Sequence, residues 1–146
     1  MMSSLAIEGY ASLFNLEDLS GDIVLPGAFA DGLAGGRTAG RNVPMLYQHE
    51  PTEPVGRWQI IRQDRKGLWV EGEIVDASEQ SRSVQALVRR GALNGLSIGF
   101  RTRSSRPRPS RGRFLEAIEL WEVSIVTFPM LPQARLSLAA SDRRAA

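Results

Sequence analysis

Apolar and polar residues alternate along much of the chain, in short runs separated by glycine, proline and polar turns. A period of two is typical of strands that bury one face. Runs 55–64 and 67–75 flank a short turn, which predicts an antiparallel hairpin. The segments that predict strands are 5–14, 43–49, 55–64, 67–75, 93–103 and 114–128.

The segment 76–91 has helical spacing instead. Val84, Leu87 and Val88 share one face of a helix, and Gly91 fits its end. Asp76 is a candidate N-cap, because Glu79 follows three residues later as in a capping box. A second, short helix is expected over 29–36, and residues 31–42, rich in glycine, alanine and polar groups, predict a mobile loop.

Many short strands with one clear helix predict an α+β, mainly β fold. We expect a closed β-barrel flanked by a few helices. The chain has 146 residues, enough for one domain with its own core. We expect the barrel domain to occupy 1–136 and a flexible C-terminal tail to occupy 137–146, where the residues become small and polar.

The composition excludes several kinds of site. The chain has no cysteine, which removes disulfides, thiolate metal ligands and a cysteine nucleophile. With one histidine and no ligand-spaced carboxylates, we expect no metal and no other cofactor. No apolar run approaches the ~20 residues that span a bilayer, and the N-terminus lacks the pattern of a signal peptide.

Arginines gather in one segment, although the net charge is only +2. They are Arg101, Arg103, Arg106, Arg108, Arg111 and Arg113. Because prolines interrupt residues 105–113, we expect a solvated, disordered loop there. A scaffold-docking or peptide-binding surface is the alternative. Nucleic-acid binding is disfavoured, since no aromatic residues are interleaved with the arginines.

The stretch GALNGLSIGF places one hydroxyl between two glycines. In a strand, Gly95, Ser97 and Gly99 point the same way, while Leu96 and Ile98 point into a core. Ser97 is then either a nucleophile with open space for a substrate or a small residue where another backbone packs closely. On the first interpretation Gly95 and Gly99 are substrate-binding positions.

A serine nucleophile needs a base, and His49 is the only histidine. It ends a predicted strand, just before a proline-rich turn. Taken alone, it also fits a surface histidine. Glu50 and Glu53 lie beside it in sequence, but we expect them to be solvated.

A carboxylate is needed to orient the base. In the run 114–128, alternation places Glu122 in a mostly apolar row, where a protonated His49 is a natural partner. Glu119, on the opposite face, is the second candidate. An end-of-barrel residue reaching water or an arginine is the non-catalytic alternative for Glu122. The residues of the Glu122 row are Ile118, Leu120, Glu122, Ser124, Val126 and Phe128.

Four stretches occur in the order found in the prohead maturation proteases of tailed phages. The chain resembles that family from about Ile7 to Ala134, and the family is distantly similar to the herpesvirus capsid protease, assemblin. The stretches are GYASLFNLEDLSGDIVLPGAF, PMLYQHEPTEPVGRW, LNGLSIGF and LWEVSIVTFPMLPQA.

The resemblance implies a serine endopeptidase on an assemblin-like β-barrel. It puts the family's histidine on His49, its serine on Ser97 and the acid of its EVS motif on Glu122. Assemblins use a second histidine as the third member, and this chain has none. The resemblance further implies an active homodimer, by analogy with assemblins.

The implied substrates are the scaffold protein or the scaffolding segment of the major capsid protein, and the protease itself. Cleavage would take place inside the prohead, in the bacterial host cytoplasm, with no membrane and no nucleic acid as partner. The alternative function is a non-enzymatic capsid-assembly factor that binds capsid subunits through its arginine-rich loop.

Overall fold

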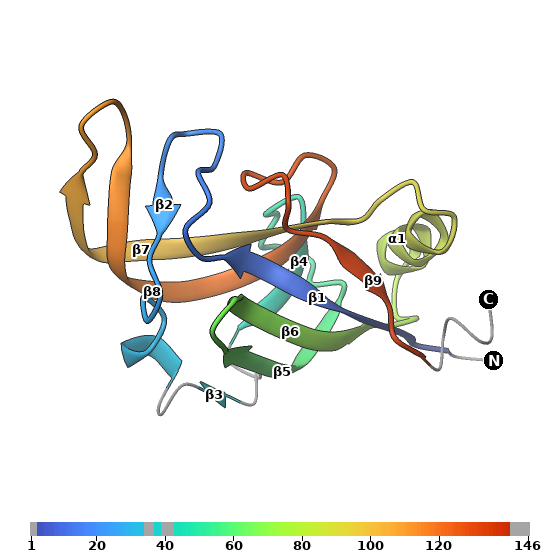
Figure 1. Cartoon of the computed structure of the whole chain (residues 1–146). Coiled ribbons are helices and arrows are strands. Elements are labelled where there is room, and N and C mark those ends of the chain that lie inside the picture. The colour runs from blue at the N-terminus through green and yellow to red at the C-terminus, as the bar shows by residue number, and fades with distance from the viewer. Residues whose placement is uncertain (1–2, 34–36, 39–42, 141–146) are drawn as a thin grey trace.

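The computed structural model describes residues 3–33, 37–38 and 43–140, and the elements are labelled in Figure 1. The fold is mainly β, as the sequence predicts. The strands are β1 Leu5–Leu13, β2 Ile23–Val24, β3 Arg37–Thr38, β4 Pro44–Tyr47, β5 Gly56–Gln63, β6 Gly67–Ile74, β7 Gly95–Pro107, β8 Arg113–Val126 and β9 Leu136–Leu138. The helical elements are the 3₁₀ turn Asp31–Leu33 and α1 Glu79–Arg89.

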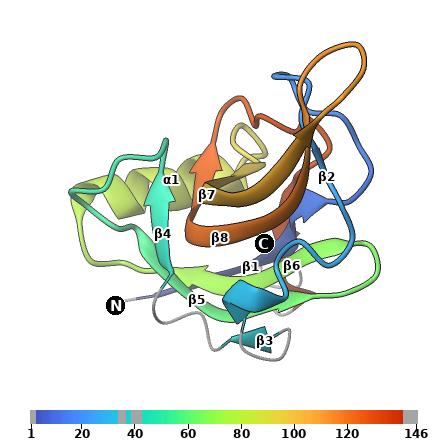
Figure 2. The same cartoon turned by 90° about the vertical axis from the view of Figure 1, so that its left-hand side faces the viewer.

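The described strands form one sheet in the order β2-β8-β4-β5-β6-β1-β9, with β7 paired to β8 and β3 to β5. The sheet curls, so that the β7–β8 hairpin faces β5, β6 and β1 (Figure 2). Apolar side chains fill the space between these two parts. The fully buried members of this core include Ile7, Trp58, Val70, Leu96, Val123 and Ile125.

The closed barrel expected from the sequence is not supported. No ladder of paired strands joins β9 to β7 within the described residues, and an isolated bridge between Gly95 and Arg135 is the pairing there. β9 has only three residues, and Pro129 and Pro132 precede it. Because proline has no N–H, the segment after β8 cannot supply a continuous ladder that closes the sheet.

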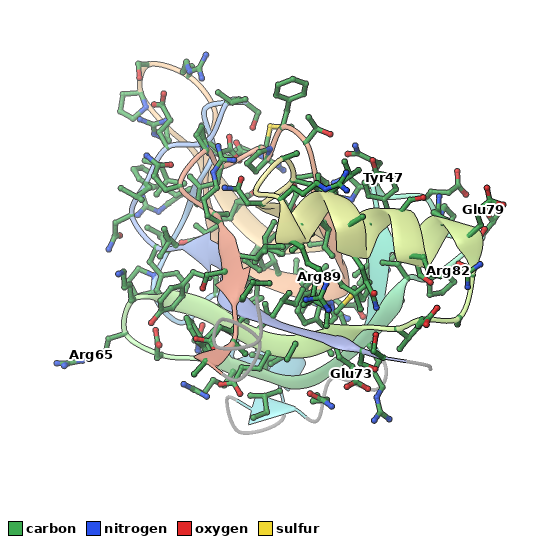
Figure 3. All side chains as sticks on the ribbon, turned by 90° about the vertical axis from the view of Figure 1, so that its right-hand side faces the viewer. Tyr47, Arg65, Glu73, Glu79, Arg82 and Arg89 are labelled. Atoms are coloured by element: carbon green, nitrogen blue, oxygen red, sulfur yellow. The ribbon has the colours of Figure 1, made fainter. Side chains whose placement is uncertain are left out.

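The helix α1 begins two residues later than expected. Ser78, not Asp76, is the N-cap: its hydroxyl accepts from the Ser81 N–H at 3.0 Å, and Ser81 completes the capping box. Asp76 instead pairs with Arg82 at 3.2 Å. Figure 3 looks onto the helix, with Glu79 and Arg82 near its start and Arg89 in its last turn.

The core face of α1 also differs from the expectation. Val84 and Val88 are buried as predicted, but Leu87 is 38% exposed. Gln85 takes its place, because its side-chain amide donates to the Ile74 carbonyl at 2.8 Å and to the Ser3 carbonyl at 3.0 Å. A buried amide with two hydrogen bonds satisfies its polar atoms while it fills the interface.

The arginine-rich segment 105–113 is an ordered hairpin rather than the expected disordered loop. β7 runs to Pro107, β8 starts at Arg113, and the Arg108 N–H donates to the Gly112 carbonyl at 3.0 Å. Two guanidinium groups stack on Phe114, with Arg106 4.3 Å and Arg108 5.8 Å from its ring centre. Figure 1 shows this hairpin reaching away from the rest of the sheet.

Of the other expected features, the short helix over 29–36 is reduced to the 3₁₀ turn Asp31–Leu33. Residues 34–36 and 39–42, within the loop expected to be mobile, lie outside the described residues. So does the tail from residue 141 onward. Ser137 and Leu138, assigned to that tail, belong to β9, which pairs with β1.

Candidate active site

Three neighbouring strands bring the candidate residues together. β8 lies between β4 and β7, and Ser124 of β8 pairs with Leu46 on one side and with Ser97 on the other. His49 follows β4 directly, and Glu122 is two residues before Ser124. Residues 49, 97 and 122 therefore meet at one region of the sheet, although they are far apart in sequence.

The turn that carries His49 has an unusual backbone. Gln48 and His49 both have positive φ angles, of 55° and 61°, and the Glu50 N–H donates to the Tyr47 carbonyl at 3.0 Å. Two such residues in a row define a primed β-turn, which costs energy for residues other than glycine. Figure 3 marks Tyr47, where the turn begins.

Contacts to β8 hold this turn in place. The Gln48 side chain donates to Thr127 Oγ1 at 2.6 Å and accepts from the Thr127 N–H at 3.1 Å. The Gln48 N–H donates to the Ile125 carbonyl at 3.0 Å. The histidine is thus presented at a fixed place beside β8, which accounts for a glutamine directly before it.

His49 and Glu122 form a direct pair. The distance from His49 Nδ1 to Glu122 Oε2 is 2.5 Å, and the two side chains are 43% and 15% exposed. The carboxylate accepts the Nδ1 proton, which leaves Nε2 as the nitrogen available to a substrate or nucleophile. An imidazole oriented in this way can take up and return a proton at Nε2.

The second carboxylate oxygen is also engaged. Ser124 Oγ donates to Glu122 Oε1 at 2.8 Å, and Ser124 Oγ itself accepts the His49 backbone N–H at 3.0 Å. Ser124 is fully buried. The sequence placed Ser124 in the row of Glu122 but gave it no role, because its partners come from β4 and β8 together.

A β-bulge explains how Glu122 reaches the site. Gly99 pairs with Glu122 and Phe100 pairs with Leu120, so Trp121 is an extra residue in β8. Before the bulge the buried side chain is Ile118, and after it Val123 is buried. The extra residue shifts the alternation by one, so that an even-numbered residue faces the core before the bulge and an odd-numbered one after it. The predicted single row from 118 to 128 is therefore wrong.

Glu119, the second candidate for the acid, lies elsewhere. Its carboxylate pairs with Arg103 at 3.1 Å, and the hydrogen bond from Trp121, followed by that from Arg103, lowers the pKa of Glu119. Glu50 accepts from the Thr52 N–H and hydroxyl, which lower its pKa. Both acids are bound to other side chains, and Glu122 is the acid that contacts the imidazole of His49.

Ser97 lines a cavity of about 210 Å³ together with His49. Ser97 is 6% exposed, and its hydroxyl makes no hydrogen bond within the part of the chain that the structure describes. A hydroxyl that faces a cavity without an internal partner is free to engage a ligand. The wall is mostly apolar and includes Leu13, Leu16, Leu96, Leu115, Met130 and Leu131.

Two loops contribute residues to the wall of this cavity, among them Leu16 and Met130. The Leu19 N–H donates to the Met130 carbonyl at 2.9 Å, which joins the loop after β1 to the loop after β8. Three large apolar side chains stay accessible on these loops: Leu16, Leu19 and Met130, at 37%, 63% and 49% exposure. Exposed apolar clusters beside a cavity are typical of a binding groove.

The two glycines beside Ser97 do not leave open space. A Cβ at Gly99 would lie 2.7 Å from Cδ of Glu122, and a Cβ at Gly95 would lie 2.6 Å from the Val126 carbonyl oxygen. The atoms over these glycines belong to the chain itself. Gly99 makes room for the Glu122 carboxylate, and Gly95 permits close approach of β8.

The arginines of the β7–β8 hairpin are largely paired inside the chain. Glu17 contacts both Arg108, at 2.7 Å, and Arg111, at 3.5 Å. This arrangement neutralises much of the charge that suggested a docking surface. The remaining pairs are Arg103 with Glu119, Arg106 with Glu116 and Arg113 with Asp22.

Among the described residues, no three histidine or carboxylate side chains are grouped closely enough to hold a metal ion. In the same part of the chain, no helix has the length and apolar character required to cross a membrane.

Comparison with known proteins identifies the family of the chain. Residues 2–145 match the family model described as caudovirus prohead serine protease. The chain is 37% identical over 137 residues to the prohead protease of Enterobacteria phage HK97, covering 92% of this chain and 60% of that protein. It is 28% identical over 136 residues to the prohead protease of Escherichia phage T5, covering 92% and 63%.

Solved structures with the same fold are herpesvirus proteases. The protease of Kaposi's sarcoma-associated herpesvirus, in complex with a hexapeptide phosphonate inhibitor, aligns with a TM-score of 0.65 at 17% identity. The alignment covers 94% of this chain and 65% of that chain. Varicella-zoster virus protease aligns with a TM-score of 0.59 at 14% identity, over 94% and 65% of the two chains.

The family model and the two phage relatives thus define the class of the chain as that of the serine peptidases. The chain belongs to the caudovirus prohead serine protease family. It spans about 60% of the length of the two phage proteases.

Proposed function

We propose that the chain is a serine endopeptidase in which Ser97 is the nucleophile, His49 the general base and Glu122 the acid that orients it. The observation that carries the proposal is the 2.5 Å contact between His49 Nδ1 and Glu122 Oε2, beside a cavity that Ser97 also lines. Membership of the prohead protease family supports it.

In the first step, Ser97 Oγ attacks the scissile carbonyl carbon and its proton passes to His49 Nε2. Glu122 keeps the proton on Nδ1 and stabilises the imidazolium that forms. The C–N bond then breaks, the imidazolium gives its proton to the departing amine, and an ester to Ser97 remains. Water attacks this ester by the same route in reverse and releases the acid.

The cavity beside Ser97 indicates the kind of peptide bond that is cut. Its wall is mostly apolar, and the exposed Leu16, Leu19 and Met130 continue this surface outward. Burial of an apolar side chain there contributes roughly 25 cal/mol per Å² of area removed from water. We expect a peptide with an apolar side chain close to the scissile bond.

We further propose that the substrate is the scaffold protein or the scaffolding segment of the major capsid protein, with self-cleavage, inside the prohead in the bacterial host. Relatives named prohead proteases support this. A similar chain also forms part of a protein named capsid polyprotein in Pseudomonas phage PAJU2, 30% identical over 110 residues and 16% of that protein. Confinement in a shell would raise the local concentration of substrate.

The test is co-expression with the matching major capsid protein, comparing wild type with Ser97→Ala by gel and intact mass. Wild type is expected to shorten the capsid protein at one site, and Ser97→Ala to lose at least ~10³-fold of this activity. Equal products from both variants, or whole capsid protein in assembled shells with both, would favour a non-enzymatic assembly factor.

A further inference from the structure

We propose that Ser124 is a positioning residue that fixes the His49–Glu122 pair in the orientation required for proton transfer. The inference rests on the proposed peptidase function for its kinetic part and on geometry for the rest. Ser124 is fully buried, so its hydroxyl has no water to serve as an alternative partner.

The hydroxyl of Ser124 has one proton, and the two contacts determine where it goes. An ionised carboxylate can only accept and a backbone N–H can only donate. Ser124 Oγ therefore donates to Glu122 Oε1, at 2.8 Å, and accepts the His49 N–H, at 3.0 Å. Both contacts together fix the rotamer of the serine and the direction of its proton.

These contacts close a ring of hydrogen bonds. Ser124 holds Oε1 of Glu122, Oε2 of Glu122 holds Nδ1 of His49, and the His49 backbone N–H returns to Ser124. The carboxylate is thus anchored at both oxygens, which prevents its rotation about the last side-chain bond. The histidine is anchored at its ring and at its backbone.

The ring of hydrogen bonds also supports the strained turn at His49. His49 has a φ of 61°, a conformation that needs compensating contacts, and its N–H has Ser124 Oγ as partner. Loss of the hydroxyl would take away the partner of the His49 N–H and the partner of one carboxylate oxygen. Both consequences act on the same imidazole, so Ser124 influences the site through His49 and Glu122 rather than through the substrate.

A purely structural role makes a different prediction. Ser81 is an equally buried serine with several hydrogen bonds, but it caps α1. Ser124→Ala and Ser81→Ala each remove one buried hydroxyl. If Ser124 only fills space and satisfies backbone groups, both variants should lower stability alike and leave the site unchanged.

The first measurement uses the fact that His49 is the only histidine. In tag-free protein, the proton NMR signal of the imidazole Nδ1–H is therefore unambiguous, and its short bond to Glu122 places it far downfield. In Ser124→Ala we expect this signal to move upfield or to be lost by exchange with water. In Ser81→Ala we expect it to stay. An unchanged signal in folded Ser124→Ala would overturn the proposal.

The second measurement is a kinetic cycle on a peptide substrate. Ser124→Ala should lower kcat about 10- to 100-fold, the loss expected for one hydrogen bond to a charged group, with KM changed less than about 3-fold. In a Glu122→Ala background, Ser124→Ala should lower kcat by a much smaller factor. Losses that multiply in the double variant would contradict action through Glu122.

Ser124→Cys provides a second variant if the alanine variant does not fold, because it keeps the volume with a weaker donor. It should show the NMR change and the kcat loss in smaller degree, and wild-type values in a folded Cys variant would overturn the proposal. If the proposed peptidase function is wrong but Ser124 does position the pair, the results differ from those above. Wild type would then show no Ser97-dependent cleavage, while the NMR signal would still respond to Ser124.

Discussion

At the scale of single residues, the sequence identifies the base more securely than the acid. His49 is the only histidine, so any serine–histidine chemistry must use it. Glu122 and Glu119 are three residues apart on one strand, and alternation places them on opposite faces without saying which face meets His49. Only the pairing of β8 with β4 decides, and it puts Glu122 at 2.5 Å from the imidazole.

The two acids give a matched pair of variants. Glu122→Gln should lower kcat by roughly 10²-fold or more, because the amide can hold the imidazole in the wrong tautomer and cannot stabilise its charge. Glu119→Gln removes an ion pair with Arg103 that solvent screens, and it should leave kcat unchanged. Peptide-cleavage kinetics check both, and the opposite order of effects would assign the acid to Glu119.

The two glycines beside Ser97 should respond differently to the same substitution. Gly99→Ala puts a methyl group against the Glu122 side chain, which must then move out of its contacts with His49 and Ser124, so the main effect should be a lower kcat. Gly95→Ala meets the Val126 carbonyl oxygen at 2.6 Å, a backbone atom, and should cost ~1–3 kcal/mol of stability.

Thermal unfolding and peptide cleavage, measured on both glycine variants, separate these effects. Full activity in folded Gly99→Ala would mean that the Glu122 carboxylate need not lie over residue 99.

At the scale of elements, strand positions were predictable and their irregularities were not. The alternating runs predicted most strands to within a few residues, since one face of each is buried. The bulge at Trp121 and the turn at Gln48–His49 depend on partners in other strands. Both irregularities lie at the proposed site, where local pattern is expected to fail.

The arginine-rich hairpin shows the same limit. Proline and arginine content predicted disorder, whereas carboxylates distant in sequence and the ring of Phe114 hold the segment as two strands. Two of the acids that pair with it, Glu17 and Asp22, come from the loop after β1, whereas Glu116 comes from β8. No local property of residues 105–113 indicates these partners.

The pair of Asp22 with Arg113 predicts how stability depends on pH. Asp22 accepts from the Arg113 N–H at 2.8 Å and from its guanidinium at 2.8 Å, and the hydrogen bond from that side chain lowers the pKa of Asp22. A lowered pKa means that the stabilisation is present above the unfolded value, about 3.9, and is lost as pH falls through the folded value.

Asp22→Asn should therefore lower the free energy of unfolding by ~1–3 kcal/mol at neutral pH. The difference from wild type should begin to shrink below about pH 4, where the carboxylate of the unfolded chain becomes protonated, and should vanish only below the lower pKa of the folded protein. Urea unfolding from pH 7 to pH 3 measures this, with the exposed Asp31→Asn as control. A difference that stays constant with pH would show that the charge of Asp22 is not the cause.

At the scale of the whole molecule, the sequence predicted the class of fold but not how the sheet ends. Counting strands indicates a mainly β domain, whereas closure depends on whether the last strand pairs with β7. Here β9 is short and proline precedes it, so one bridge joins the two regions. The cavity opens beside this region and is lined by residues on both sides of it, such as Ser97 and Leu131.

We propose that the fold activates Ser97 as a nucleophile, by placing His49 and Glu122 beside the cavity that it lines. The most direct measurement is intact mass after reaction with a peptidyl phosphonate that carries an apolar side chain, followed by peptide mapping. One adduct per chain, located on Ser97, absent from Ser97→Ala and much slower to form in His49→Ala, is the expected result. Wild-type protein that stays unlabelled, or Ser97→Ala that labels equally well, would contradict the account.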